Sequence, residues 1–228
     1  AIAQNPQTGA VLALVSLPSF DNNDFEGTGR SDANGGAEQV NRILQDSNQP
    51  LFNRVISGRY SPGSTIKPLL ALAGLQEKVV TPQTTVMANG SISVKSVYDS
   101  NVIYTFKDWK VHGLTDLKKA IADSVDVYFY ALGGGYGNIR GLGVDKIASY
   151  LKNWWADHKL GIDLPGEVTG FVPTPDWKQQ AKQEAWFIGD TYNLSIGQGD
   201  LLVTPLWLNT YLGAIANGGK ILKPFLVR

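Results

Sequence analysis

Ser64 and Lys67 stand three residues apart in the stretch SPGSTIKP, residues 61 to 68. At this spacing two side chains share one face of a helix, with Cβ atoms roughly 5–6 Å apart, so the lysine amine can reach the serine hydroxyl. A serine hydroxyl becomes a good nucleophile only when a base removes its proton. A neutral lysine can be that base, and the pair therefore indicates acyl transfer through a serine ester.

This chemistry requires a lysine whose pKa is far below its usual value. Bringing it from about 10.4 to near 7 corresponds to roughly 4–5 kcal/mol, which burial and nearby positive charge can supply. Only a fold that buries this lysine in a prepared site would supply a free energy of that size.

The spacing by itself is weak evidence, because Ser149 and Lys152 in SYLK have it too. Ser149 falls inside a predicted helix, where its hydroxyl can only bond back to the backbone. Ser64 instead follows a Pro-Gly pair at a predicted helix N-terminus, where free N–H groups stabilise negative charge. Position rather than spacing favours Ser64.

Two other segments contain candidate site residues. Ser124 and Asp126 lie in SVDVYFY, between the end of one predicted helix and the start of an aromatic one, and an N-cap pair explains them if the segment is taken alone. Gln198 and Gly199 lie in SIGQGD, where a tight turn is as good an explanation as a binding site.

Other catalytic patterns are absent from the sequence. There is no GxSxG nucleophile elbow and no phosphate-binding GxxxxGK[ST]. His112 and His158 stand apart, which gives no support to a metal site or a Ser-His-Asp triad. Zero cysteines exclude disulfides, thiolate metal sites and a cysteine nucleophile. We expect neither a metal nor a cofactor.

Composition bounds the class of protein. The 228 residues are 43% hydrophobic and 18% charged, which is enough for a real core and one large domain over residues 1–228. A net charge of zero gives no electrostatic reason for nucleic acid or an anionic membrane as a partner. No apolar run approaches the roughly 18 residues that span a bilayer.

The elements that would hold the site follow from apolar periodicity and turn residues. The patterns predict a hairpin, a loop and a short polar helix, then a buried helix whose first turn contains Pro68. Strands, three helices, a Pro- and Gly-rich loop, a last helix and a closing strand follow. This order predicts an α+β fold with helices over a mostly antiparallel sheet. The expected ranges are 1–5 and 10–16 (hairpin), 18–36 (loop), 37–45, 66–75, 84–110 (strands), 116–123, 125–137, 144–161, 161–177 (loop), 204–219 and 221–227 (closing strand).

Four segments in this order resemble the transpeptidase domain of class B penicillin-binding proteins. They are TGAVLALVSLPSFDNNDF, LFNRVISGRYSPGSTIKP, LTDLKKAIADSVDVYFYALG and GDTYNLSIGQGDLLVTPLWLNTYLGAIANGGKI, and together they run along the whole chain. The Ser-Val-Asp motif followed by YFY is most similar to the elongation-type members, penicillin-binding protein 2. The resemblance implies the fold shared with serine β-lactamases.

The resemblance also implies an activity and roles for residues. It implies a D,D-transpeptidase that cross-links peptidoglycan stem peptides through an acyl-enzyme and is acylated by penicillin, in cell-wall elongation and cell-shape maintenance. Ser64 matches the nucleophile, Lys67 its base and Ser124 a proton relay, while Gln198 and Gly199 match a substrate-binding segment. Asp126 stands where most relatives have Asn, and a carboxylate there would raise the pKa of Lys67.

The family's third motif, Lys-Thr-Gly or Lys-Ser-Gly, does not occur in this sequence. Relatives carry it downstream of the segment that matches ANGGKILKPFLV. We therefore expect a partial transpeptidase domain that is incomplete at the C-terminus, without membrane anchor or pedestal domain, and inactive or nearly so by itself.

Two further readings stay open at this stage. A β-lactam sensor or serine β-lactamase shares the fold and the serine–lysine motif, and a non-catalytic scaffold of the elongation machinery would explain the missing third motif. The implied partners are stem peptides, β-lactam antibiotics and, for the parent protein, membrane proteins of the elongation complex, with no nucleic acid. The implied location is the extracytoplasmic face of the cytoplasmic membrane.

Overall fold

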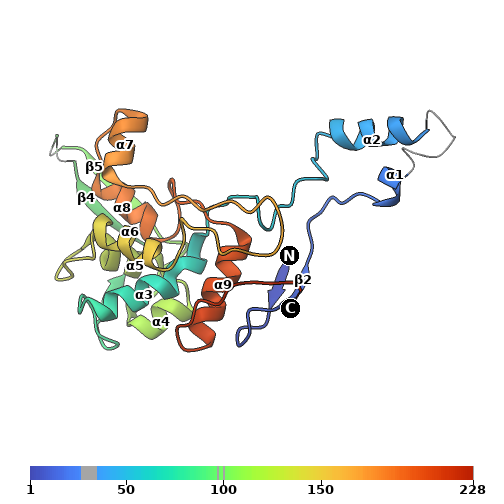
Figure 1. Cartoon of the computed structure of the whole chain (residues 1–228). Coiled ribbons are helices and arrows are strands. Elements are labelled where there is room, and N and C mark those ends of the chain that lie inside the picture. The colour runs from blue at the N-terminus through green and yellow to red at the C-terminus, as the bar shows by residue number, and fades with distance from the viewer. Residues whose placement is uncertain (27–34, 97, 100, 228) are drawn as a thin grey trace. The chain divides into compact units, whose positions relative to one another are not determined.

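The computed structural model describes residues 1–26, 35–96, 98–99 and 101–227 (Figure 1). The chain divides into two compact units. One consists of Ala1–Tyr60, His158–Thr169 and Val203–Arg228, and the other of Ser61–Asp157 and Gly170–Leu202. The candidate residues from Ser64 to Gly199 all belong to the second unit.

The first unit begins with the predicted hairpin. Strands β1 (Ile2–Gln4) and β2 (Val11–Leu14) pair antiparallel, with Ile2 opposite Leu14, and the register shifts between Ala3 and Gln4. The predicted polar helix is α2 (Gly35–Gln45), which contacts a short helix α1 (Asn23–Glu26) inside the predicted loop. Residues 27–34 of that loop lie outside the described residues.

The last predicted helix is α9 (Pro205–Ala216), which packs on β1. The Thr204 hydroxyl accepts a hydrogen bond from the backbone N–H of Trp207, and Pro205 occupies the first turn, where its missing N–H leaves no bond unmade. None of the helices in the described part of the chain is long and apolar enough to cross a membrane.

The predicted closing strand over residues 221–227 is wrong. The segment lies against the hairpin but forms an isolated bridge, between Ala10 and Phe225, in place of a strand. Pro224 has no N–H to give to a ladder, the Phe225 N–H donates to the Gly9 carbonyl at 3.3 Å, and the N–H groups of Leu226 and Val227 donate to the Asp163 carboxylate at 2.8 and 2.9 Å. Pairing with the hairpin therefore stops at Phe225, because the next two amides bind Asp163.

The second unit contains four strands, of which the first three lie in the predicted β region 84–110 and the fourth follows it. Strand β3 (Val86–Ala88) pairs with β6 (Gly113–Thr115), and β4 (Ser91–Lys95) pairs with β5 (Ile103–Lys107). With β1 and β2, all strand pairs of the described residues are antiparallel and form separate two-stranded sheets. The predicted α+β class is confirmed, although the strands are shorter and more dispersed than one continuous sheet.

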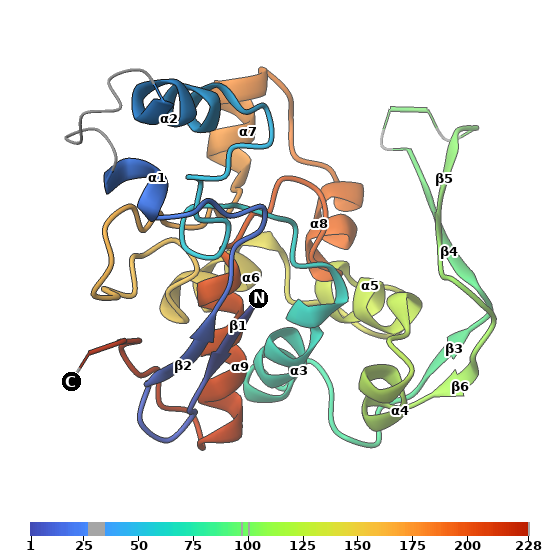
Figure 2. The same ribbon diagram turned by 90° about the vertical axis from the view of Figure 1, so that its right-hand side faces the viewer.

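Helix α5 (Asp126–Gly134) lies among the other helices of the second unit (Figure 2). It is apolar on all sides and buried from Val127 to Gly133, as expected of a helix in the middle of a core. A Cβ at Gly133 would lie 1.6 Å from the Ser195 hydroxyl, so only glycine permits this approach. The packed neighbours are α3 (Lys67–Gln76), α4 (Leu117–Ala122), α6 (Val144–Asn153) and α8 (Ile188–Ser195).

Two predicted boundaries in this unit are wrong. Helix α6 ends at Asn153 rather than near Gly161, since Trp155 adopts a left-handed backbone with φ of 63°. Helix α7 (Pro175–Lys182) begins inside the predicted loop, with Thr174 as its N-cap and Pro175 in its first turn. The same Thr-Pro sequence begins α9, at Thr204 and Pro205.

Candidate active site

Ser64 and Lys67 lie on either side of a helix boundary. Ser64 belongs to a 3₁₀ turn, η2 (Gly63–Ile66), and Lys67 is the first residue of α3, with its backbone N–H donating to the Ser64 carbonyl. The sequence predicted an α-helical turn for this pair, and the observed turn is tighter, because i and i+3 side chains eclipse in a 3₁₀ helix. Ser64 is exposed, whereas Lys67 is only 2% exposed.

The Lys67 amine contacts two other predicted site residues, Ser124 and Asp126. Its Nζ donates to Ser124 O at 2.8 Å, to Ser124 Oγ at 3.0 Å and to Asp126 Oδ1 at 2.5 Å. An ammonium group has three donors, and these contacts use all of them. The lysine therefore ties α3 to the segment between α4 and α5.

Ser124 reaches the lysine through an unusual backbone conformation. Its φ is 53°, in the left-handed region that few residues other than glycine adopt, at the point where α4 ends and α5 is about to begin. This turn directs both its carbonyl and its hydroxyl at Lys67. Such strain persists only where surrounding contacts fix it, and it is typical of functional sites.

The pKa of Lys67 lies below its usual value, because burial disfavours the charged amine. The Asp126 carboxylate opposes this by its hydrogen bond and its charge, and the charge of Asp108 opposes it further. The Phe129 ring, with its centroid 5.3 Å from Nζ, also favours the charged form. Asp126 thus raises the lysine pKa as expected, yet burial is the larger effect.

Gln198 and Gly199 lie in a turn that is held next to Ser64. The neighbouring Gly197 accepts a hydrogen bond on its carbonyl from the backbone N–H of Gly63 at 2.8 Å. Gln198 is itself exposed, and its backbone N–H donates to the Asn193 carbonyl. The GQG turn therefore borders the 3₁₀ turn of the serine, without a described contact to Lys67.

The duplicate pair at Ser149 and Lys152 has no such setting. Both residues lie within α6, where Ser149 Oγ accepts only from Asn153 Nδ2, one helical turn away, at 3.5 Å. The structure agrees with the prediction that position distinguishes the two pairs.

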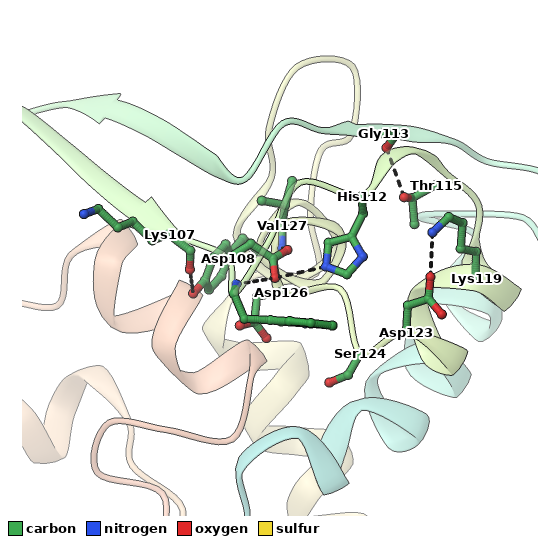
Figure 3. A network of polar contacts seen from close by, with 12 residues as sticks. Lys107, Asp108, His112, Gly113, Thr115, Lys119, Asp123, Ser124, Asp126 and Val127 are labelled. Atoms are coloured by element: carbon green, nitrogen blue, oxygen red, sulfur yellow. Dashed lines mark hydrogen bonds and ion pairs between the residues drawn. The ribbon is translucent and has the colours of Figure 1, made fainter.

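The buried side chain of Asp108 lies next to the site and escaped the sequence reasoning, whereas His112 beside it was considered only as a metal or triad residue. Asp108 follows β5, and its Oδ2 accepts a hydrogen bond from the backbone N–H of Val127 at 2.9 Å, while its Oδ1 lies 3.4 Å from His112 Nε2 (Figure 3). The sequence signal for such a contact was Val125 at the N-cap of α5. A valine side chain cannot accept a hydrogen bond, so a cap for this helix comes from elsewhere in the chain. Within the described ranges no group of three or more His, Cys, Asp or Glu residues could hold a metal ion.

The arrangement suits one kind of chemistry. An exposed hydroxyl precedes a buried lysine amine by one tight turn, and a second hydroxyl contacts the same amine. A base-activated serine of this kind can attack a carbonyl and form an ester, with the second hydroxyl available to carry the proton onward.

Known proteins resemble this chain over its full extent. Residues 1–228 match the family model described as "Penicillin binding protein transpeptidase domain". The peptidoglycan D,D-transpeptidase MrdA of Haemophilus influenzae is 35% identical over 230 residues, which cover 100% of this chain and 33% of that protein. The chain spans about a third of the length of the curated relatives it matches.

Solved structures agree. Penicillin-binding protein PBP2 of Helicobacter pylori, in complex with MreC, is 34% identical with a TM-score of 0.83, covering 98% of this chain and 38% of that one. Penicillin-binding protein A of Mycobacterium tuberculosis, as an imipenem acyl-enzyme, is 25% identical with a TM-score of 0.78, covering 99% and 47%. The chain belongs to the family of penicillin-binding-protein transpeptidase domains.

Proposed function

We propose that this chain forms the nucleophile-bearing part of a peptidoglycan D,D-transpeptidase, with Ser64 as the residue that carries the acyl group. The observation behind the proposal is the convergence of Lys67 Nζ on Ser124 Oγ and Asp126 Oδ1, one 3₁₀ turn from Ser64. A nucleophilic serine needs an adjacent general base, for which Lys67 is the candidate, and Ser124 Oγ can carry the proton onward from that amine.

In the first half of the reaction, Ser64 Oγ attacks the carbonyl carbon of the penultimate D-alanine of a stem peptide. The neutral Lys67 amine takes the serine proton as the new C–O bond forms. Collapse of the tetrahedral intermediate breaks the peptide C–N bond, and the departing amine of the terminal D-alanine receives a proton from Lys67 through the Ser124 hydroxyl. An acyl ester on Ser64 and free D-alanine result.

In the second half, the amine of a neighbouring stem peptide attacks this ester. It loses a proton by the reverse route, through the Ser124 hydroxyl to Lys67, and the C–O bond to Ser64 breaks as the cross-linking amide forms. The serine recovers its proton, so atoms and charge balance over the cycle. Lys67 alternates between neutral and charged forms, which fits an amine whose pKa burial has lowered.

A β-lactam would acylate the same serine in the first half of this cycle. The imipenem acyl-enzyme of the mycobacterial relative supports this part of the proposal. The partly exposed Asp126 carboxylate would stabilise the ammonium form of Lys67 within each half, while the tetrahedral intermediate exists, since it contacts the amine directly.

Further assignments belong to the same proposal. Residues 1–228 would be part of one transpeptidase domain, with Gln198 and Gly199 in the substrate-binding wall. The parent protein would work at the extracytoplasmic face of the cytoplasmic membrane, with elongation-complex membrane proteins as partners. The complex of the Helicobacter pylori relative with MreC supports that choice of partner.

The test is covalent labelling of the full-length protein that contains this chain by a fluorescent penicillin. We expect one label, which mass spectrometry of the digested protein finds on the peptide with Ser64, and no label in Ser64→Ala. Lys67→Arg should acylate about 10²–10⁴-fold more slowly, because arginine keeps the charge but cannot act as a base.

Ser149→Ala and Lys152→Arg are matched controls, since they change the same residue types at the same spacing within α6. Both should label like the parent protein. A parent protein that takes no label, or a Ser64→Ala variant that labels as fast as the parent, would contradict the proposed function and favour a scaffold.

A further inference from the structure

Helix α5 starts without a cap of its own. Its N-cap position is Val125, which makes no side-chain hydrogen bond to the first turn. The first residues of a helix carry N–H groups without partners, and a cap normally satisfies the second or third of them. Val127 is the second residue of α5, and its N–H donates to Asp108 Oδ2, from 19 residues earlier in the chain.

Asp108 is firmly held in this position. Its own N–H donates to the Gly90 carbonyl, its Oδ1 accepts from the N–H of Trp109 at 2.8 Å, and the His112 N–H donates to the Ala88 carbonyl. The His112 ring packs edge-on to Trp109, with centroids 5.0 Å apart. The side chains of Asp108 and His112 are fully buried, so the carboxylate has little freedom to turn away (Figure 3).

The capped turn is the one that orders the candidate active site. Asp126 is the first residue of α5 and Ser124 stands two residues before it, and both contact Lys67 Nζ. A shift of the first turn of α5 would therefore move both partners of the lysine together. A carboxylate at a helix N-terminus also opposes the helix dipole favourably.

We propose that Asp108 is a positioning residue, which caps α5 in place of Val125 and thereby holds Ser124 and Asp126 against Lys67. This rests on the proposed function, in which Lys67 is the base. The carboxylate also acts on the site by its charge, because it favours the ammonium form of Lys67. Capping and charge can be separated experimentally.

The first variant for the full-length protein is Asp108→Ala, which removes both the cap and the charge. Acylation by fluorescent penicillin should slow by about ten- to a hundredfold, since small displacements of catalytic groups cost that much. Hydrogen exchange in the first turn of α5 should rise. The pH at which acylation reaches half its maximum should fall, because the amine loses a proton more easily without the carboxylate.

The second variant adds Val125→Thr to Asp108→Ala, which gives α5 a local cap of similar shape. The Val125→Thr single variant is the reference. In the double variant, both hydrogen exchange in α5 and the acylation rate should return most of the way to the values of that reference. The midpoint of the pH profile should stay low, since the charge is still missing. A role of Asp108 in general stability alone would give no such separation between rate and midpoint.

Asp116→Ala is the matched control. Asp116 caps α4 through the N–H of Lys119 at 2.8 Å, so its loss removes an equivalent bond from another helix of the unit. Exchange should rise in α4, with the midpoint of acylation unchanged. The midpoint depends on every charged or titrating group near Asp108, so these residues stay constant: Lys67, Lys110, His112, Asp123, Asp126 and Tyr130.

Two results would overturn the inference. One is unchanged exchange at α5 in Asp108→Ala, and the other is a threonine at position 125 that restores neither exchange nor rate. A parent protein without a label on Ser64 refutes the proposed function instead, and exchange at α5 then still decides whether Asp108 is the cap.

Discussion

The carbonyl of Gly197 accepts a backbone hydrogen bond from Gly63, and the two residues are so close that a Cβ on Gly197 would lie 2.1 Å from the Gly63 oxygen. Gly197 has a φ of 74° and precedes Gln198, while Gly63 precedes Ser64. Two segments more than a hundred residues apart thus meet without a side chain between them, one bearing the candidate nucleophile and the other the candidate substrate-binding turn.

Gly197→Ala should therefore damage the site more than the fold. The methyl group would push against the backbone of the 3₁₀ turn, and we expect penicillin acylation of Ser64 to slow at least about tenfold. Gly143→Ala is a matched control, with a φ of 79° and no atom within 4 Å of its added Cβ. Its ψ of 160° puts it in a region essentially restricted to glycine, so the variant should lose about 1–3 kcal/mol of stability and still keep its acylation rate. Equal acylation rates for the two variants would contradict this account.

The pH dependence of acylation should respond to Asp126. In the proposed mechanism Lys67 acts as a base when neutral, so the rate of acylation should rise as pH passes through the pKa of Lys67. Asp126 raises that pKa by a hydrogen bond and by its charge, and Asp126→Asn removes the charge. The rise in rate should thus occur at lower pH. Asp123→Asn, which changes a half-exposed carboxylate paired with Lys119, should leave the rise in place, as pH–rate profiles of both variants would reveal.

Gly133→Ala tests the contact between α5 and α8. The added Cβ would meet the Ser195 hydroxyl at 1.6 Å, and overpacking of this kind costs about 1–3 kcal/mol of stability. The control is Gly213→Ala in α9, where the nearest atom is 3.7 Å away. That change should stabilise the protein by about 0.5–1 kcal/mol, because glycine is a poor helix former. Denaturant unfolding of the full-length variants measures both, and a stable Gly133→Ala would disprove the close contact.

The sequence predicted those parts of the site that are fixed by local chemistry. Ser64 and Lys67 could be paired because a Pro-Gly sequence and Pro68 mark where a helix begins. The expected range 116–123 gives the start of α4 correctly, since its cap, Asp116, is adjacent to the helix in the chain. The family resemblance then joined Ser124 to the pair, which no periodicity could have done.

The parts that escaped prediction depend on contacts between distant segments. Asp108 could not be linked to α5 because its partner, the Val127 N–H, is 19 residues away and backbone amides leave no mark in a sequence. The closing strand was predicted from apolar residues alone, and Asp163 takes the amides of Leu226 and Val227 instead. Helix α7 is a different case, since its Thr174–Pro175 start was readable but masked by the surrounding prolines and glycines.

At Ser124, the residue that best suits the left-handed backbone differs from the residue that supplies a hydroxyl to Lys67. A glycine there would adopt φ of 53° without penalty and make the turn between α4 and α5 easier to form. It would also remove the hydroxyl that contacts Lys67. Under the proposed function, selection for thermal stability alone would therefore favour a residue that cannot relay the proton, and the serine at position 124 keeps the relay at a cost in stability.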